Sequence, residues 1–389
     1  MMDRYNVSDY GEMVADPVRM AAYARAIEQR VKAGGVVVDL GAGVGLFALL
    51  ARQAGARLVF AIEPNEAIVL LEAALAERGD RDAVRCIQKV SQAVSLPERA
   101  DLIVSDLRGT LPLHADHIET IIDARERFLA PGGTLIPQAD RLWSAVVESE
   151  ALYKKSVGPW RGLPGGFRME AAHRMVCNNW VRVERSERVR KDQLLTPATP
   201  WADLDYMTIK SPNAGGETMS TVDRSGLAHG LVVGFDATLA EGIGFSNLPG
   251  VVEQPSVYGC GFFPWPEPVA LVEGDQVSVH IDARFSGGDY IWRWDSTVET
   301  ANGTRKAAFQ QSTFAGVPRS KGQLLKAEAG YVPRLDIEGQ IDRLVLNGMD
   351  QKATVSAIAA SLQRAFPSEF NTPGSALARV GQLSRRYSL

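Results

Sequence analysis

The chain is poor in the residues that build disulfide frameworks and metal centres. It has only three cysteines, Cys86, Cys177 and Cys260, and five histidines in 389 residues. The cysteines lie far apart and have none of the close paired spacings of zinc sites. We therefore expect free thiols in a reducing compartment, no disulfides and no bound metal.

Long hydrophobic runs and a strong charge of one sign are also missing. No segment approaches the ~20 apolar residues that span a bilayer, and residues 1–7 have no apolar signal core. The formal net charge is −4, and the basic residues are scattered. We expect a cytoplasmic protein whose partners include neither a membrane nor a nucleic acid.

The most informative segment is residues 36–50, where an apolar strand leads into a glycine-rich turn and an apolar helix. Gly41, Gly43 and Gly45 lack a Cβ, so the backbone can turn tightly and a ligand can lie against it at the positive end of the next helix. Glu63 ends the following apolar run, ~20 positions further on, where an acid can accept hydrogen bonds from both hydroxyls of a ribose. The pattern predicts a site for a nucleotide-type cofactor.

The details of the turn favour S-adenosylmethionine. A dinucleotide fingerprint reads G-x-G-x-x-G, whereas this turn reads Gly41-x-Gly43-x-Gly45 and follows Asp39. The cofactor has no phosphate, but it has a cationic sulfonium and an ammonium that an acid at a strand end can face. Asp39 is placed to be that acid.

The chain is expected to contain an α/β domain, a β-barrel domain and a small helical module. Strand and helix patterns alternate over residues 1–137, which predicts a Rossmann-like parallel sheet. Short β-rich runs over residues 138–325 predict an antiparallel barrel, interrupted by residues 153–206. Residues 326–389 carry helical patterns and are expected to form a winged-helix-like module. The expected strands of the first domain are 36–39, 58–62, 84–88, 101–105 and 134–137; the expected strands of the barrel include 141–148, 230–239, 276–283 and 289–295.

Several blocks together resemble the protein arginine methyltransferase family. Before the cofactor strand, Met13, Asp16, Arg19 and Tyr23 have the spacing of that family's cofactor-covering helix. The other matching blocks are 38–45, 51–56, 62–63, 101–106, 124–137, 244–246 and 273–275. The resemblance implies a methyl transfer from S-adenosylmethionine and a head-to-tail homodimer formed through the arm at residues 153–206.

The resemblance also implies roles for individual residues. Arg19 would pair with the methionine carboxylate, a contact that suits a bidentate guanidinium, and Glu63 would hold the ribose. Val90 and Ser91 would contact adenine. The cofactor-binding residues expected in this way are Met13, Arg19, Asp39, Gly41, Gly43, Gly45, Glu63, Val90, Ser91 and Ser105.

The acceptor loop departs from the family. Family members hold the substrate guanidinium between two glutamates on this loop, whereas here the first is shortened to Asp106 and the second aligns with Ala115. A base is needed only if the nucleophile must lose a proton. Asp106 is the first candidate for a base or for substrate orientation; Asp116, His114 and His117 are the others. The family's threonine-histidine-tryptophan segment is altered to residues 256–258, which lack the histidine.

The tail, from Gln340 to Pro367, resembles the peptide-chaperone domain of pyrroloquinoline quinone biosynthesis and related leader-peptide binders. Its apolar residues at helical spacing are typical of a core. This resemblance favours a peptide acceptor, while a lid or an interaction module is the alternative.

We therefore expect a methyltransferase that acts on a nitrogen or oxygen acceptor, with a peptide or protein acceptor first and arginine as the leading residue by family. One alternative is a methyltransferase of small molecules such as natural products. The other is a non-catalytic regulatory subunit that keeps the cofactor fold.

Overall fold

The structure is a computed structural model that describes residues 6–161, 163–184, 187–249 and 256–388. The chain divides into two compact units, Met1–Pro318 and Arg319–Leu389, and each is described separately. Residues 1–5 lie outside the described residues, so the structure does not bear on the expectation of a chain without a signal core.

The first part of the larger unit is a five-stranded parallel sheet in the order β3-β2-β1-β4-β5. Its strands differ in burial: the three inner ones are buried, near-continuous apolar runs, as expected for a sheet covered on both faces, and the two at the edges are partly exposed. They are β1 (Val36–Leu40), β2 (Leu58–Ile62), β3 (Val84–Ile87), β4 (Ala100–Ser105) and β5 (Leu129–Ile136). The expected Rossmann-like sheet is present, and its strands β1, β2 and β4 lie where the apolar runs predicted them.

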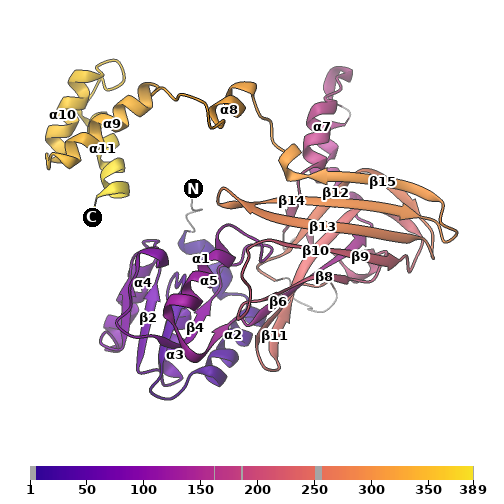
Figure 1. Ribbon diagram of the computed structural model, residues 1–389, viewed down its shortest axis with the longest axis horizontal. Helices are drawn as coiled ribbons and strands as arrows, with labels where there is room; N and C mark the ends of the chain where they lie inside the picture. Colours follow the sequence, from indigo (N-terminus) through magenta and orange to yellow (C-terminus); the bar gives the residue numbers. More distant parts are fainter. Residues whose placement is uncertain (1–5, 162, 185–186, 250–255, 389) are drawn as a thin grey trace. The chain divides into compact units, whose positions relative to one another are not determined.

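Helices flank this sheet (Figure 1). They are α1 (Val7–Val14), α2 (Pro17–Arg30), α3 (Leu46–Gln53), α4 (Ile68–Arg78) and α5 (His117–Phe128). The predicted start of α2 is confirmed: Asp16 is its N-cap, its Oδ1 accepts from the Arg19 backbone N–H at 3.0 Å, and Pro17 occupies the first turn.

Strand β5 begins earlier than expected. Its proline and glycines at 131–133 predicted a break, but pairing with β4 starts at Leu129 and resumes at Thr134 after a register shift. Gly132 takes the left-handed conformation inside this irregularity, at a φ of 76°. The turn residues therefore form a bulge within one strand instead of separating a helix from a strand.

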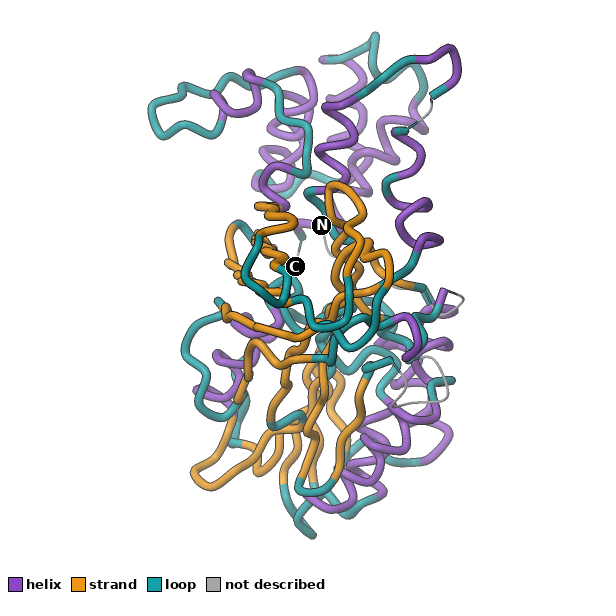
Figure 2. Tube along the Cα trace, turned by 90° about the vertical axis from the view of Figure 1, so that its right-hand side faces the viewer, coloured by secondary structure: helices purple, strands orange, loops and turns teal. Residues whose placement is uncertain are grey.

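The second part of this unit consists of long antiparallel strands that twist around a shared interior (Figure 2). One sheet has the order β7-β12-β10-β6-β8, with β11 paired to β10, and the other has the order β15-β14-β13-β9. β8 contacts β9 and β12 contacts β15, so the sheets meet at both sides as in a barrel. The strands are β6 (Ala139–Val147), β7 (Val181–Val183), β8 (Thr199–Asp205), β9 (Ala214–Thr221), β10 (Gly226–Ala240), β11 (Ile243–Ser246), β12 (Cys260–Leu271), β13 (Gln276–Ser286), β14 (Asp289–Glu299) and β15 (Arg305–Ser312).

Aromatic side chains fill the interior of these sheets. Phe263 packs edge-on against Trp292 and Trp294, with ring centroids 5.6 and 5.0 Å apart. The buried indole of Trp265 donates to Ser296 Oγ at 3.1 Å, and that of Trp294 donates to Gln311 Oε1 at 2.9 Å. Each of these indole N–H groups is thus satisfied inside the core.

An insertion separates β6 from β8. It holds α6 (Glu150–Ser156), the short helices η2 (Gly158–Trp160) and η3 (Pro164–Gly166), α7 (Glu170–Cys177), strand β7 and η5 (Lys191–Gln193). Figure 1 shows α7 projecting beyond the strands, although it contacts β12. The Phe167 side chain, just before α7, is 72% exposed.

The smaller unit is helical. It contains α8 (Lys321–Lys326), α9 (Ile337–Asp350), α10 (Val355–Ala365) and α11 (Pro373–Tyr387), and residues 319–388 form no strand. Val345, Leu362 and Val380 are fully buried and join α9, α10 and α11 in a core of their own. The expected helical character of the tail is confirmed.

The described residues contain neither a candidate membrane span nor a candidate metal centre. No helix there has the length and hydrophobicity to span a membrane. Likewise, the described histidine, cysteine, aspartate and glutamate side chains form no group that could hold a metal ion.

Candidate functional site

The glycine turn connects β1 to α3 at the carboxyl edge of the parallel sheet. Gly43 has a φ of 54° and Gly45 a φ of 81°, in the left-handed region that favours glycine. A Cβ on Gly43 would lie 2.6 Å from the Tyr10 ring of α1, and one on Gly45 would lie 2.4 Å from Leu71. The turn therefore requires glycine both for its conformation and for the close approach of its neighbours.

Glu63 follows β2 and is bound to this turn. Its Oε2 accepts from the Gly43 N–H at 2.8 Å, and its Oε1 accepts from the Asn65 N–H at 2.7 Å. Burial raises the pKa of the carboxyl, although both N–H groups oppose that shift. Each oxygen has further acceptor capacity, so the geometry suits a carboxylate that also accepts from two hydroxyls.

Asp39 is a fully buried acid on β1. Its Oδ2 accepts from the Ala48 N–H at 2.8 Å, whereas its Oδ1 has no hydrogen-bond partner within the described part of the chain. Burial raises the pKa of Asp39 to about 7, opposed by the Ala48 N–H and reinforced by the charge of Glu63. An unsatisfied buried acceptor is costly, so this atom fits a ligand that brings a cation or an N–H group.

Ser105 is the last residue of the neighbouring strand β4 and pairs with Leu40 of β1. Like Asp39, it has a buried polar atom without a partner in the described chain. Its buried Oγ has no hydrogen-bond partner among the described residues, and its carbonyl oxygen accepts from Tyr23 Oη at 3.0 Å. Asp39 and Ser105 thus lie on adjacent parallel strands near their carboxyl ends. Open α/β sheets bind ligands at this edge, where the strand order reverses.

Arg19 connects this edge to Asp106. Its Nη2 lies 2.6 Å and its Nε 2.7 Å from Asp106 Oδ2, and its Nη1 donates to the Met13 carbonyl at 3.1 Å. Tyr258 Oη donates to the same Asp106 oxygen at 2.5 Å. Burial opposes the ionisation of Asp106, but the charges of Arg19 and Arg108 outweigh it and lower the pKa of that carboxyl below its usual value.

Arg108 forms the second half of the cluster, with a side chain that is fully buried. Its Nε lies 3.2 Å from Asp106 Oδ1, its Nη1 lies 2.8 Å from Asp140 Oδ1, and its Nη2 donates to Tyr23 Oη at 2.5 Å. Tyr206 Oη completes the cluster by donating to Asp140 Oδ2 at 2.6 Å. The four charged groups Arg19, Arg108, Asp106 and Asp140 balance one another.

The other acceptor-loop candidates lie in different environments. His117 is buried, its Nδ1 is 2.9 Å from the Pro112 carbonyl, and burial together with the charge of Arg108 lowers its pKa to about 3. It is therefore neutral at physiological pH. His114 is exposed, and so is Asp116, which precedes α5 without a side-chain cap bond. Ala115 has a φ of 40°, a conformation that disfavours the glutamate found there in the family.

The remaining expected cofactor residues lie around the same edge. Met13 lies in the last turn of α1 and is half-buried, and Gly41 packs under Leu107 of the acceptor loop. Val90 follows β3 with 40% of its surface exposed, while Ser91 is buried at the start of η1 (Ser91–Ala93). Their roles toward a cofactor remain predictions.

Sequence reasoning missed Arg108, Asp140 and Tyr206. The only available signal was Arg108 itself, a cation two positions after Asp106 in a loop expected to bind a cation. Asp140 and Tyr206 come from β6 and the residue after β8, and nothing in their sequence neighbourhood connects them to the loop.

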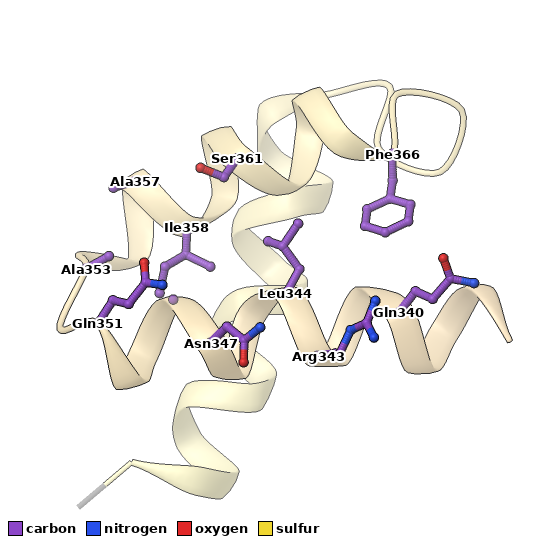
Figure 3. A pocket seen from close by; sticks show the side chains of 11 residues that line it. Gln340, Arg343, Leu344, Asn347, Gln351, Ala353, Ala357, Ile358, Ser361 and Phe366 are labelled. Atoms are coloured by element: carbon purple, nitrogen blue, oxygen red, sulfur yellow. The ribbon is translucent and has the colours of Figure 1, made fainter. Parts of the chain in front are cut away.

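The smaller unit has a groove between α9 and α10, with a volume of about 420 Å³. Leu344, Ile358 and Phe366 supply its apolar surface, and Arg343 and Asn347 line its α9 side (Figure 3). The expected resemblance of this unit to leader-peptide binders remains a prediction.

Comparisons with known proteins agree on one group. No protein-family model matches the chain. It is 26% identical to protein arginine N-methyltransferase 1 of Dictyostelium discoideum over 236 residues, which cover 59% of this chain and 68% of the relative. It is 30% identical to protein arginine N-methyltransferase 6 of Danio rerio over 219 residues, which cover 53% of this chain and 61% of the relative.

Two solved structures have the same architecture. One is a Trypanosoma brucei PRMT1 enzyme-prozyme heterotetrameric complex with AdoHcy, with a TM-score of 0.71 and 19% identity over 79% of this chain and 98% of that one. The other is Arabidopsis thaliana protein arginine methyltransferase 10, with a TM-score of 0.69 and 21% identity over 79% and 97%. The resemblance expected from the sequence is therefore confirmed: the chain is a relative of the protein arginine methyltransferases and has their Rossmann-like and β-barrel fold.

Proposed function

We propose that the chain binds S-adenosylmethionine and transfers its methyl group to a nitrogen or oxygen acceptor on a peptide or protein. The observation that carries this proposal is the carboxyl edge of the parallel sheet. There Glu63 is fixed to the glycine turn by two backbone N–H bonds, and Asp39 keeps an unsatisfied buried oxygen. The relatives named as methyltransferases and the neighbour solved with AdoHcy support the same cofactor.

When bound, the cofactor supplies an electrophilic methyl group on a sulfonium. The chain's residues then have separable tasks. Glu63 would hold the ribose hydroxyls, Arg19 the methionine carboxylate, and Asp39 the ammonium. Methyl transfer depends mainly on in-line positioning, and we expect the acceptor to approach from the side of Asp106.

Calorimetry with S-adenosylmethionine and S-adenosylhomocysteine tests the proposal. Replacing Glu63 with alanine removes two charged hydrogen-bond acceptors worth ~1.5–3 kcal/mol each, so we expect affinity for S-adenosylhomocysteine to fall about 100-fold or more. Glu66→Ala is the matched control, since Glu66 is exposed only three positions further on. Binding of neither cofactor form by the unaltered chain would contradict the proposal, and equal affinities in the two variants would remove the ribose role of Glu63.

Cofactor affinity should also depend on pH through Asp39, whose pKa is raised by burial to about 7. Below that pH the carboxyl is protonated and cannot attract the ammonium. We expect S-adenosylhomocysteine to bind about tenfold more tightly at pH 8 than at pH 6. An Asp39→Asn variant should lack this dependence; a slope of the same size in that variant would assign it to another group.

Asp39 affects the stability of the chain without ligand in the opposite direction: its contribution is larger at low pH than at high pH. Without ligand, the folded chain holds the Asp39 proton up to about pH 7, whereas the unfolded chain releases it near pH 3.8. The folded state therefore binds more protons in this window, and the Asp39 contribution to stability falls as pH rises through it. In urea unfolding, the free energy of unfolding should fall less between pH 5 and pH 7 for Asp39→Asn than for the unaltered chain.

We further propose a cytoplasmic homodimer that uses the insertion around α6 and α7. The exposed Phe167 and Met169 beside α7 support such a contact, and the unpaired thiols of Cys86, Cys177 and Cys260 support a reducing compartment. Light scattering tests the dimer: Phe167→Ser together with Met169→Ser should shift the mass toward the monomer, and a monomeric unaltered chain would contradict it.

A further inference from the structure

The buried cluster beside β4 has the composition of a receptor for a guanidinium cation, and the chain's own Arg108 occupies it. Asp106 and Asp140 approach this guanidinium from two directions, at 3.2 and 2.8 Å, and Tyr23 Oη accepts from its third nitrogen. The side chains of both acids are almost completely buried. Charged hydrogen bonds of this kind are the strong ones in a low-dielectric interior.

Aromatic rings enclose the same guanidinium. Its carbon lies 5.4 Å from the ring centroid of Phe235, 5.3 Å from that of Phe245 and 5.6 Å from that of Tyr258. Phe245 and Tyr258 stack with centroids 5.6 Å apart, and Phe235 meets both edge-on. Carboxylates together with ring faces are how proteins hold organic cations.

This receptor lies where an acceptor would meet the cofactor. Asp106 directly follows β4, whose last residue, Ser105, pairs with Leu40 of β1. Arg19 links the two regions, since it pairs with Asp106 and its charge acts on Asp39. Arg108 itself belongs to the acceptor loop and reaches back into the receptor from two positions after Asp106.

Every carboxylate oxygen of the receptor already has a donor, and its two acids are matched in charge by two arginines. Both oxygens of Asp106 are engaged, Oδ2 by Arg19 and Tyr258 and Oδ1 by Arg108. Both oxygens of Asp140 are engaged by Arg108 and Tyr206. An incoming arginine would meet two buried guanidinium groups without an unpaired acid to bind it.

We propose that Arg108 is a built-in occupant that keeps external guanidinium groups out of this receptor. The part concerning acceptors rests on the proposed function: the acceptor of this chain carries an uncharged nucleophile, a hydroxyl or neutral amine, and not an arginine side chain. Arg108 is thus a specificity-determining residue of the acceptor site.

The test empties the receptor and offers a replacement. Arg108→Ala removes two methylene groups and the guanidinium, which N-ethylguanidine matches in size and charge. We expect N-ethylguanidine to raise the Tm of this variant by about 2 °C at ten times its Kd, with no rise in the unaltered chain. N-ethylurea, an uncharged analogue, is the control ligand and should have no effect.

A second variant guards against failure to fold. Arg108→Ala with Asp140→Asn removes the charge of Asp140 and leaves Asp106 Oδ1 without its Arg108 partner beside the rings, so it should still bind N-ethylguanidine, more weakly than Arg108→Ala does. No rise in the Tm of either folded variant, or an equal rise in the unaltered chain, would overturn the receptor assignment. Transfer of labelled methyl groups to the arginine of a Gly-Arg-Gly peptide by the unaltered chain would overturn the exclusion.

Calorimetry with S-adenosylhomocysteine on the same samples separates the two proposals. Cofactor binding without stabilisation by N-ethylguanidine would contradict the Arg108 inference alone. Stabilisation without cofactor binding would support the receptor and contradict the proposed function.

Discussion

Replacing Arg108 with methionine is expected to lower the free energy of unfolding by about 3–5 kcal/mol, the typical cost of removing one partner from a buried ion pair. Methionine is apolar and of similar length, so the change removes the charge with little loss of volume. Asp140 would then keep only the Tyr206 hydroxyl, and burial already raises the pKa of Asp140 despite the opposing charge of Arg108. The measurement is urea-induced unfolding.

Two further variants make this expectation specific. Arg108→Met with Asp140→Asn removes both charges and should recover most of the lost stability, since a buried pair replaced as a whole is often neutral. Arg141→Met, next to Asp140 in β6, breaks the exposed pair with Asp203 and should cost only about 0–1 kcal/mol. A loss at Arg108 no larger than that at Arg141 would mean that the cluster is not energetically coupled.

The parallel sheet could be predicted because its signals are local. β2 is a five-residue apolar run, β1 is one interrupted only by Asp39, and the glycines that follow β1 are needed for the turn itself. Strand β12 was not predicted, because its prolines at 264, 266 and 268 interrupt the usual strand pattern. It forms nevertheless, since its other residues pair with β10 and contribute Phe263 and Trp265 to the barrel interior.

The cluster around Arg108 could not be predicted from the sequence, for a different reason. The hydrogen bond between Arg108 and Asp140 joins residues 32 positions apart, and that between Arg108 and Tyr23 joins residues 85 positions apart. No helical or strand periodicity links such residues. Asp106 could be singled out because it aligns with the first glutamate of the family's acceptor loop, but its pairing with two arginines required the three-dimensional structure.

That pairing changes the chemistry expected of Asp106. A general base works best when its pKa lies near the operating pH, whereas Arg19 and Arg108 lower the pKa of Asp106 against the effect of burial. The carboxylate is therefore better suited to orient groups by charge than to take up a proton. His117, with a pKa lowered to about 3, is poorly matched to that task as well.

Replacing Arg19 with glutamine is expected to weaken the binding of S-adenosylhomocysteine by about 100-fold or more, as truncation of a buried charged contact costs ~2–5 kcal/mol. The Arg19 guanidinium is the buried cation beside Asp39, and its position is set by Asp106 and the Met13 carbonyl. A ligand carboxylate can bind it only by sharing it with Asp106. Glutamine keeps the length of the side chain but lacks the charge, so calorimetry reports the electrostatic contact.

Arg25→Gln is the matched control, because Arg25 is exposed on the same helix and its loss should leave the affinity unchanged. Asp106 keeps Arg108 and Tyr258 as partners in the Arg19 variant, so the protein should remain folded and the loss should appear in binding more than in stability. Equal affinities of the two variants would separate Arg19 from the cofactor and make its pairing with Asp106 purely structural. A loss of affinity confined to the Arg19 variant would instead place the cofactor carboxylate between the Asp39 edge and the Arg108 receptor. The Arg19 guanidinium would then contact both the cofactor and Asp106 of the receptor.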